Sequence, residues 1–193
     1  MESSGCDYCG KPLISEIDRC LSCRNNEQMA FDRAFVLFPY TGKYQRLLAA
    51  YKFSKNLALG NFFAEKIAQA LSRFDLPEDI AIVPVPPRQG KIRASGWDQI
   101  EYLAHLLDKD KGGSELPPLH RCLKRLESKS QKELGRDNRK TNLRKRIVPV
   151  KQVPQTAILI DDVMTTGSTL DACALALKEG GAKTVYGLCL FYD

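Results

Sequence analysis

Two adjacent carboxylates stand between an apolar run and a hydroxyl-rich turn near the end of the chain. Residues 158–169 read Ile-Leu-Ile-Asp-Asp-Val-Met-Thr-Thr-Gly-Ser-Thr. The apolar residues predict a short buried strand, and the turn opens a helix whose first amides are unpaired and favour an anion. Gly167 lets the backbone approach a phosphate without a Cβ in the way. The pattern therefore predicts a site for a phosphate beside diol hydroxyls or a hard cation such as Mg²⁺.

This segment resembles the 5-phosphoribosyl-1-pyrophosphate (PRPP) motif of type I phosphoribosyltransferases, in which two acids and two variable residues precede Thr-Gly-x-Thr. The resemblance implies that Asp161 and Asp162 face the ribose hydroxyls as catalytic residues, with Mg²⁺ accompanying PRPP. The alternative is a plain strand-to-helix turn, in which Thr166 or Ser168 caps the helix. The implied PRPP-binding residues are Asp161, Asp162, Val163, Met164, Thr165, Thr166, Gly167, Ser168 and Thr169.

Four cysteines near the N-terminus form two Cys-x-x-Cys pairs, Cys6/Cys9 and Cys20/Cys23, separated by ten residues. Tetrahedral Zn²⁺ takes four soft ligands, and two such pairs on tight turns supply them. We expect a structural zinc, because four thiolates leave no open position for a substrate. A disulfide or reduced free thiols are the alternatives. The metal would stabilise a module at residues 1–27, which has almost no core of its own.

The composition is that of a globular protein of one ordinary domain and a small appendage. The chain has 193 residues, of which 44% are hydrophobic. No apolar run approaches the ~20 residues that a membrane span needs. The N-terminus also lacks the charged-then-apolar pattern of a signal peptide. We therefore expect no membrane span and a cytoplasmic protein.

The elements that must position these residues alternate along the chain. Periodicity predicts strands at 35–40, 80–87, 153–161 and 184–192. Helices are expected around 44–51, from a cap at Asn61 to Leu71, at 100–107 and at 169–179. This order predicts an α/β fold with a parallel sheet flanked by helices. Ligands bind beyond the carboxyl ends of such strands, where the Asp161 and Val83–Pro86 turns both lie.

A block in the middle of the chain adds a second resemblance. Residues 83–87 read Val-Pro-Val-Pro-Pro, residues 93–99 read Arg-Ala-Ser-Gly-Trp-Asp-Gln, and Leu-Ala follows at 103–104. This block resembles the ComF (competence protein F) family of phosphoribosyltransferase-like proteins, where Val-Pro-Val-Pro precedes Arg-Gly-Phe-Asn-Gln and Leu-Ala. Ser95, Trp97 and Asp98 depart from that pattern. Further residues that resemble the family order are the four cysteines, Lys52, Phe53, Gln131, Arg136, Arg139, Asn142 and Leu143.

The resemblance implies a type I phosphoribosyltransferase-like fold for residues 28–193. It places pyrophosphate at the turn formed by Pro84, Val85, Pro86 and Arg88. Lys91 and Arg93 are further candidate contacts, since cations stabilise that leaving group, although each is equally well a solvated surface charge. Thr165 stands where purine-using members of the wider superfamily carry an acidic general base, which disfavours a purine acceptor by that route.

One basic segment accounts for the excess positive charge. Residues 121–146 hold eleven lysines and arginines against three acids, a net +8, so the rest of the chain carries −2 of the total of +6. We expect this segment to be a mobile cover over the cleft, with residues 131–142 ordering over a polyanion. Binding of single-stranded nucleic acid and a solvated basic helix are the alternatives.

Three functions remain open at this point. The first is a PRPP-binding protein with phosphoribosyltransferase (pentosyl transfer) potential, in which pyrophosphate is displaced from C1 of the ribose. The second is a factor in natural transformation: the resemblance implies DNA uptake, with single-stranded DNA and a DNA-uptake helicase as partners. The third is a regulator that senses PRPP without turnover. The residues name neither the acceptor nor the oligomeric state.

Overall fold

A four-stranded parallel sheet forms the centre of the molecule. The structure is a computed structural model that describes residues 5–25, 29–74, 77–109, 116–127 and 143–193. The strands lie in the order β1-β6-β5-β2, and every neighbouring pair is parallel. Their bounds are β1 (Arg33–Pro39), β2 (Ile80–Pro84), β5 (Thr156–Met164) and β6 (Thr184–Tyr192). The expected α/β fold with a parallel sheet is therefore confirmed.

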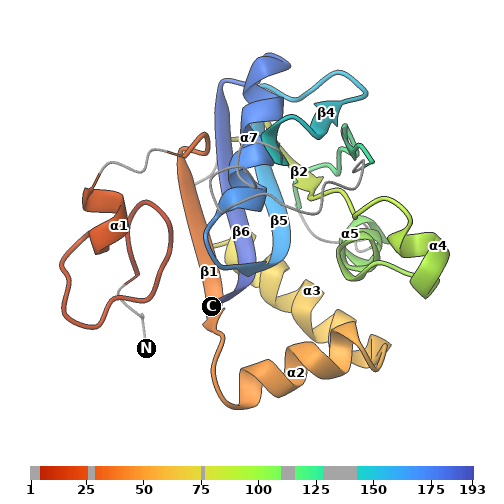
Figure 1. Ribbon diagram of the computed structural model, residues 1–193, viewed down its shortest axis with the longest axis horizontal. Helices are drawn as coiled ribbons and strands as arrows, with labels where there is room; N and C mark the ends of the chain where they lie inside the picture. Colours follow the sequence, from red (N-terminus) through yellow and green to blue (C-terminus); the bar gives the residue numbers. More distant parts are fainter. Residues whose placement is uncertain (1–4, 26–28, 75–76, 110–115, 128–142) are drawn as a thin grey trace, which may run out of the picture.

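Helices cover both faces of this sheet (Figure 1). One face packs against α7 (Ser168–Glu179), and the other packs against α2 (Lys43–Lys52), α3 (Leu57–Leu71) and α5 (Gln99–Lys109). The expected cap at Asn61 is wrong, because α3 begins at Leu57 after Asn56. None of the described helices is long and apolar enough to cross a membrane.

Alternate residues of β5 enter two separate hydrophobic cores. Ala157 and Leu159 pack with residues of α7, whereas Ile158 and Ile160 pack with residues of α3 and α5. This is the period of two that any strand has when both faces are covered. The same alternation determines which face of the sheet Asp161 and Asp162 lie on.

Two small elements lie beside the main sheet. The turn after β2 leads into α4 (Lys91–Ser95), and β3 (Leu123–Arg125) pairs antiparallel with β4 (Ile147–Pro149). Sequence periodicity predicted neither of these strands, which are only three residues long. The described parts of the basic segment are residues 121–127, which include β3, and residues 143–146, which lead into β4. Residues 128–142 of that segment, with Gln131, Arg136, Arg139 and Asn142, lie outside the described residues.

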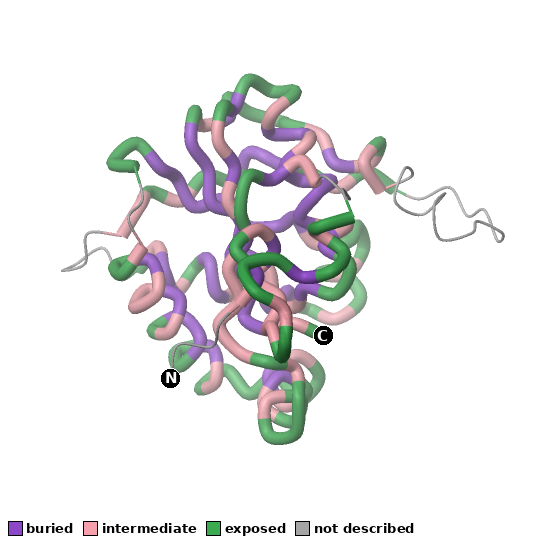
Figure 2. The backbone as a smooth tube through the Cα atoms, turned by 90° about the vertical axis from the view of Figure 1, so that its left-hand side faces the viewer, coloured by how far each residue is buried: buried purple, intermediate pink, exposed green. Residues whose placement is uncertain are grey.

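The cysteine-bearing N-terminal segment, with α1 (Leu21–Arg24), lies on the side of the free edge of β1 (Figure 1). Figure 2 shows the buried stretches of the chain running through the interior, with exposed stretches at the outer turns. The Ala34 N–H donates to the Tyr8 carbonyl at 2.7 Å. The Tyr8 ring also stacks on Phe31, with 5.4 Å between centroids. The backbone hydrogen bond pairs an edge group of β1 that would otherwise be open.

Candidate functional site

The two carboxylates lie within β5 rather than at its end. The strand was expected to end at Asp161, yet it pairs with β6 as far as Met164, opposite Tyr192. Because neighbouring residues of a strand point to opposite faces, Asp161 lies on the α7 side and Asp162 on the side of α2 and α5. Both side chains still line one cleft of about 540 Å³, which opens beyond the end of β2.

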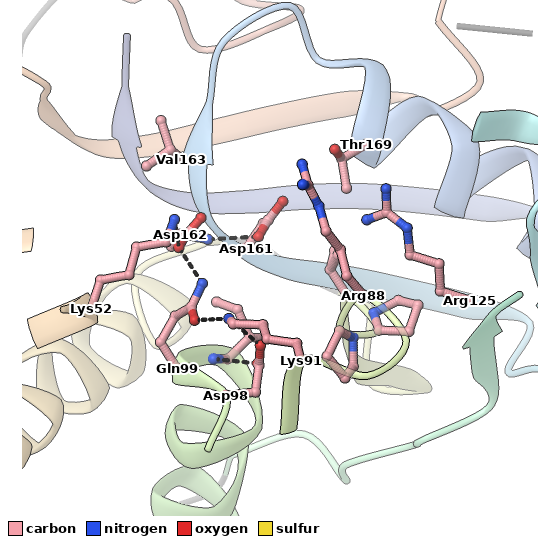
Figure 3. A pocket seen from close by; sticks show the side chains of 14 residues that line it. Lys52, Arg88, Lys91, Asp98, Gln99, Arg125, Asp161, Asp162, Val163 and Thr169 are labelled. Carbon is pink, nitrogen blue, oxygen red and sulfur yellow. Dashed lines mark hydrogen bonds and ion pairs between the residues drawn. The ribbon is translucent and has the colours of Figure 1, made fainter. Parts of the chain in front are cut away.

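Asp162 is held by a network of side chains from three helices (Figure 3). Lys52 Nζ lies 2.7 Å from Asp162 Oδ2, and Gln99 Nε2 donates to the same oxygen at 2.5 Å. Lys91 Nζ in turn donates to Gln99 Oε1 and lies 2.5 Å from Asp98 Oδ2. Asp162 is only 6% exposed, so these contacts replace the water that the carboxylate loses.

Asp161 has a different environment. It accepts a hydrogen bond from the Asp162 N–H at 2.9 Å. Its side chain lies near the guanidinium groups of Arg88 and Arg125, which line the same cleft (Figure 3). Burial, followed by the neighbouring Asp162 charge, raises the pKa of Asp161 to about 8. The carboxylate therefore gains most from a cation or hydroxyl donor that supports its ionised form.

The hydroxyl-rich turn after β5 forms a small recess beside the cleft. Residues 164–169, with Asp161 and Val163, surround a cavity of about 30 Å³. Thr165 and Thr166 are exposed, and Thr169 also lines the larger cleft. The recess lies at the N-terminus of α7, where unpaired amides favour an anion. The residues expected to bind phosphate therefore surround one recess.

Gly167 was expected to leave room for a phosphate, but the structure gives it a different role, which is to allow the backbone conformation of the turn. It is the N-cap of α7 with a φ of 72°, which favours glycine over any residue with a Cβ. A Cβ there would point at the side chains of Met164, Met29 and Phe31, which are apolar. No side chain caps this helix, so the capping alternative is wrong for Thr166 and Ser168.

The turn after β2 supplies part of the opposite wall. Val85 N–H donates to the Ile160 carbonyl at 3.1 Å, which brings the turn beside β5. Of the residues expected to bind pyrophosphate, Val85, Pro86 and Arg88 line the cleft, and so does Lys91. Pro84 and Arg93 are not among its lining residues.

Sequence reasoning missed Arg125 and gave no role to Lys52. Arg125 lies on β3 in a run of basic residues, where nothing in the local pattern distinguishes it. Burial, followed by the charge of Arg88, lowers the pKa of Arg125. Lys52 is the last residue of α2 and was noted only for its place in the family order. Gln99 is fixed by the Tyr51 hydroxyl, which donates to its carbonyl at 2.7 Å.

Trp97 does not lie in the cleft. Its ring meets Tyr51 edge-on with 5.3 Å between centroids, and it packs with Tyr102 as well. Trp97 is absent from the residues that line the cleft. Its packing holds the start of α5, which carries Gln99 and the adjacent Asp98.

One ion pair joins residues 143–146, the second described part of the basic segment, to α7. Arg144 Nε and an Nη donate to the Asp171 carboxylate at 2.7 and 2.9 Å. Asp171 is fully buried and also accepts the Ala30 N–H at 2.8 Å. A single carboxylate in the first turn of α7 thus fastens two segments that are distant in sequence.

The four N-terminal cysteines come together as expected. Their sulfur atoms all lie within 4.8 Å of one another, and Cys9 Sγ is 3.7 Å from Cys20 Sγ. Four tetrahedral Zn–S bonds of ~2.3 Å would place the sulfurs about 3.8 Å apart. Burial raises the pKa of Cys9, and raises that of Cys23 to about 12. A bound metal would therefore have to displace protons from these thiols.

The comparisons with known proteins agree with the motif evidence. The chain is 27% identical over 191 residues to Competence protein F of Haemophilus influenzae, covering 93% of this chain and 81% of that protein. It is 26% identical over 184 residues to Competence protein ComFC of Bacillus subtilis, covering 91% and 72%. ComFC of Streptococcus pneumoniae is 27% identical over 151 residues, covering 78% and 64%. No protein-family model matches the sequence.

Proposed function

Because this protein is a relative of the ComF family along nearly its whole length, we propose that it binds PRPP in the cleft beside Asp161 and Asp162 and acts in DNA uptake during natural transformation. The competence role rests on the names of its relatives. The PRPP site rests on its own side chains. One observation supports that site above all: two carboxylates and two guanidinium groups line one cleft, and the hydroxyl-rich recess at the start of α7 adjoins it.

The proposed ligand has three chemically distinct parts, and the cleft offers a partner for each. The 5′-phosphate would occupy the recess at the N-terminus of α7, formed by residues 164–169. The ribose hydroxyls would meet Asp161 and Asp162. The pyrophosphate would lie against Arg88 and Arg125, whose charges lie on the same cleft.

Asp161 is the carboxylate best placed to hold Mg²⁺ with the ligand. Its oxygens are of the kind that Mg²⁺ prefers, whereas Asp162 is already occupied by Lys52 and Gln99. Bound Mg²⁺ would neutralise charge on the pyrophosphate. The carboxylate of Asp161 would then lie near the sugar carbon where positive charge develops during displacement.

Titration of PRPP with Mg²⁺ against the wild type and the Asp161→Asn/Asp162→Asn variant tests this proposal. We expect the variant to bind at least tenfold more weakly, since both partners of the ribose lose their charge. Glu65→Gln/Glu179→Gln removes the same charge from exposed helix positions and should bind as the wild type does. Equal binding by all three proteins would refute a PRPP site at these carboxylates.

Measuring pyrophosphate release distinguishes an enzyme that turns over PRPP from a regulator that only senses PRPP. A phosphoribosyltransferase releases pyrophosphate when PRPP is incubated with an acceptor, and a pure sensor does not. Thr165, being a threonine, cannot act as a general base at neutral pH, so nitrogenous acceptors that need no such base should be tried first. Release above the level of the Asp161→Asn/Asp162→Asn variant would establish a transferase; its absence would leave a PRPP-sensing regulator.

A second candidate function is direct binding of single-stranded DNA. The observation that favours it is the charge of the described basic segment: Lys145 is exposed, and neither it nor Arg146 has an ion pair among the described residues. Binding through such cations should weaken steeply as salt rises. Lys145→Gln/Arg146→Gln should reduce both the affinity and the salt slope. Salt-independent binding, or none at low salt, would count against this function.

The four cysteines and the cellular location of the protein complete the proposed function. We infer that Zn²⁺ is the ion held by the four cysteines, because four thiolates in a closed cluster are typical of structural zinc. The proposal places the protein in the cytoplasm beside a DNA-uptake helicase. Loss of transformation by exogenous DNA in an Asp161→Asn/Asp162→Asn strain would connect the cleft with that process.

A further inference from the structure

A second cavity adjoins the cleft on the far side of Arg88 and Arg125. It measures about 350 Å³ and lies between the turn that leads into α4 and the strand β3. Arg88 and Arg125 line both cavities, as do Pro86 and Pro87. The two arginines therefore form a shared wall between the proposed PRPP cleft and a space to which no role has been given.

The lining of this second cavity combines apolar side chains with cations. Ile92 and Leu123 both line the cavity, Ile92 being 48% exposed and Leu123 9% exposed. Arg93 and Lys124 contribute exposed positive charges, and Glu127 is the acid among the lining residues. None of the lining cations forms an ion pair with any residue that the structure describes.

Arg125 is the less exposed of the two arginines in this wall. It is half-buried, and its pKa is lowered by burial and then by the neighbouring charge of Arg88. A guanidinium group that is partly removed from water and lies near a second cation is stabilised by an anion placed beside it. Asp161 is the acid that acts on Arg125, and it lies on the cleft side of the wall.

We propose that the second cavity binds a free nucleotide. Its phosphates would lie against Arg93, Lys124 and Arg125, and its base would cover the apolar side chains of Ile92 and Leu123. The volume is at the small end of the range for small-molecule sites, roughly 300–1,000 Å³, which fits one nucleotide. Proteins that bind single-stranded nucleic acid stack its bases on aromatic side chains, and none of the residues that line this cavity is aromatic. A free nucleotide is therefore favoured over a nucleic-acid strand as the ligand.

The shared arginines give this site a regulatory consequence. A guanidinium group that turns toward a nucleotide in the second cavity is lost to an anion in the cleft. Each ligand should therefore weaken the binding of the other, and this coupling must be reciprocal. A nucleotide would act as an antagonist of PRPP without occupying the PRPP cleft itself.

Calorimetric titration with adenosine diphosphate tests the site directly. Arg93→Gln/Lys124→Gln removes two charges that line the second cavity and not the cleft, and we expect at least a tenfold loss of affinity. Arg46→Gln/Arg73→Gln removes two exposed arginines elsewhere and should bind as the wild type does. Wild-type protein that fails to bind adenosine diphosphate, or an Arg93→Gln/Lys124→Gln variant that binds it normally, overturns the proposal.

Two further arms separate this site from the PRPP cleft and from a DNA site. Asp161→Asn/Asp162→Asn should retain adenosine diphosphate binding, whether or not PRPP binds the wild type; its loss would mean that the nucleotide occupies the cleft. Short oligothymidylate should not depend on Arg93 and Lys124. If it binds the wild type and loses affinity in Arg93→Gln/Lys124→Gln, while adenosine diphosphate does not, the proposal of a nucleotide site is overturned. Where PRPP binds, saturating adenosine diphosphate should raise its Kd several-fold in the wild type and not in Arg93→Gln/Lys124→Gln.

Discussion

Lys52 Nζ lies 2.7 Å from Asp162 Oδ2, and this contact joins the last residue of α2 to the carboxylate of β5. Asp162 is nearly buried, while the Lys52 side chain is 30% exposed. The pair therefore neutralises a carboxylate that cannot be well hydrated. It also fixes α2 at the edge of the cleft, where the ligand is proposed to bind.

Replacement of this lysine should damage both stability and ligand binding. Lys52→Met leaves Asp162 with Gln99 as its remaining side-chain partner, so a buried negative charge loses its counter-ion. We expect a loss of about 1–3 kcal/mol in the free energy of unfolding, measured with urea. Lys109→Met, at an exposed helix end, is the control. A Lys52→Met variant as stable as the control would show that the pair contributes nothing.

Asp161 should make stability depend on pH in an unusual direction. Its pKa is raised from 3.8 to about 8 in the folded protein, so the folded state holds a proton that the unfolded state releases between these values. Stability at this site therefore falls as pH rises from about 4 to about 8, and then levels off. Asp161→Asn has no such charge, so its Tm relative to the wild type should increase through that window.

The raised pKa of Asp161 also predicts that ligand binding releases a proton. A ligand or cation that requires ionised Asp161 must displace its proton below pH 8, so affinity should rise toward that pH. Titration of PRPP with Mg²⁺ in two buffers of different ionisation enthalpy measures the released proton. An unchanged proton release in Asp161→Asn would assign it to another group.

Removal of one N-terminal cysteine should release the metal and loosen the module. Cys9 is 6% exposed, so Cys9→Ser replaces a buried ligand with a hydroxyl that binds zinc poorly. We expect the metal content to fall to a small fraction of the wild-type value, with Tyr8 and Phe31 becoming accessible to solvent. Cys122→Ala, a buried thiol outside the cluster, should keep its metal. Equal metal content in both variants would contradict a four-cysteine site.

The Arg144–Asp171 pair should be a major support of the fold. Arg144→Met leaves a fully buried carboxylate with the Ala30 N–H as its remaining described donor. Removal of one partner from a buried pair costs roughly 3 kcal/mol. Urea unfolding should show this loss for Arg144→Met and a partial recovery for Arg144→Lys. Lys145→Met, one residue away and exposed, should unfold as the wild type does.

Local patterns were predicted well because neighbouring residues determine them. The last strand was expected at 184–192 and is found there, since its apolar residues pack on both faces. The Cys-x-x-Cys spacing brings the two sulfurs of each pair together for the same reason, as each pair closes within one turn, and the structure brings the two pairs together. The start of α3 was misplaced because Asn56 and Asn61 are equally good capping residues in the sequence.

The sequence by itself determined which chemical groups this protein carries: two adjacent carboxylates, a glycine turn at a helix start, and four cysteines. Only the tertiary structure decided how the groups are used. Strand alternation put Asp161 on the side of the sheet where Arg125 lines the cleft and put Asp162 beside Lys52, and no local pattern contains either neighbour. Such pairs depend on the order of the strands and on which helix covers each face. These are long-range contacts, which a single local segment cannot specify.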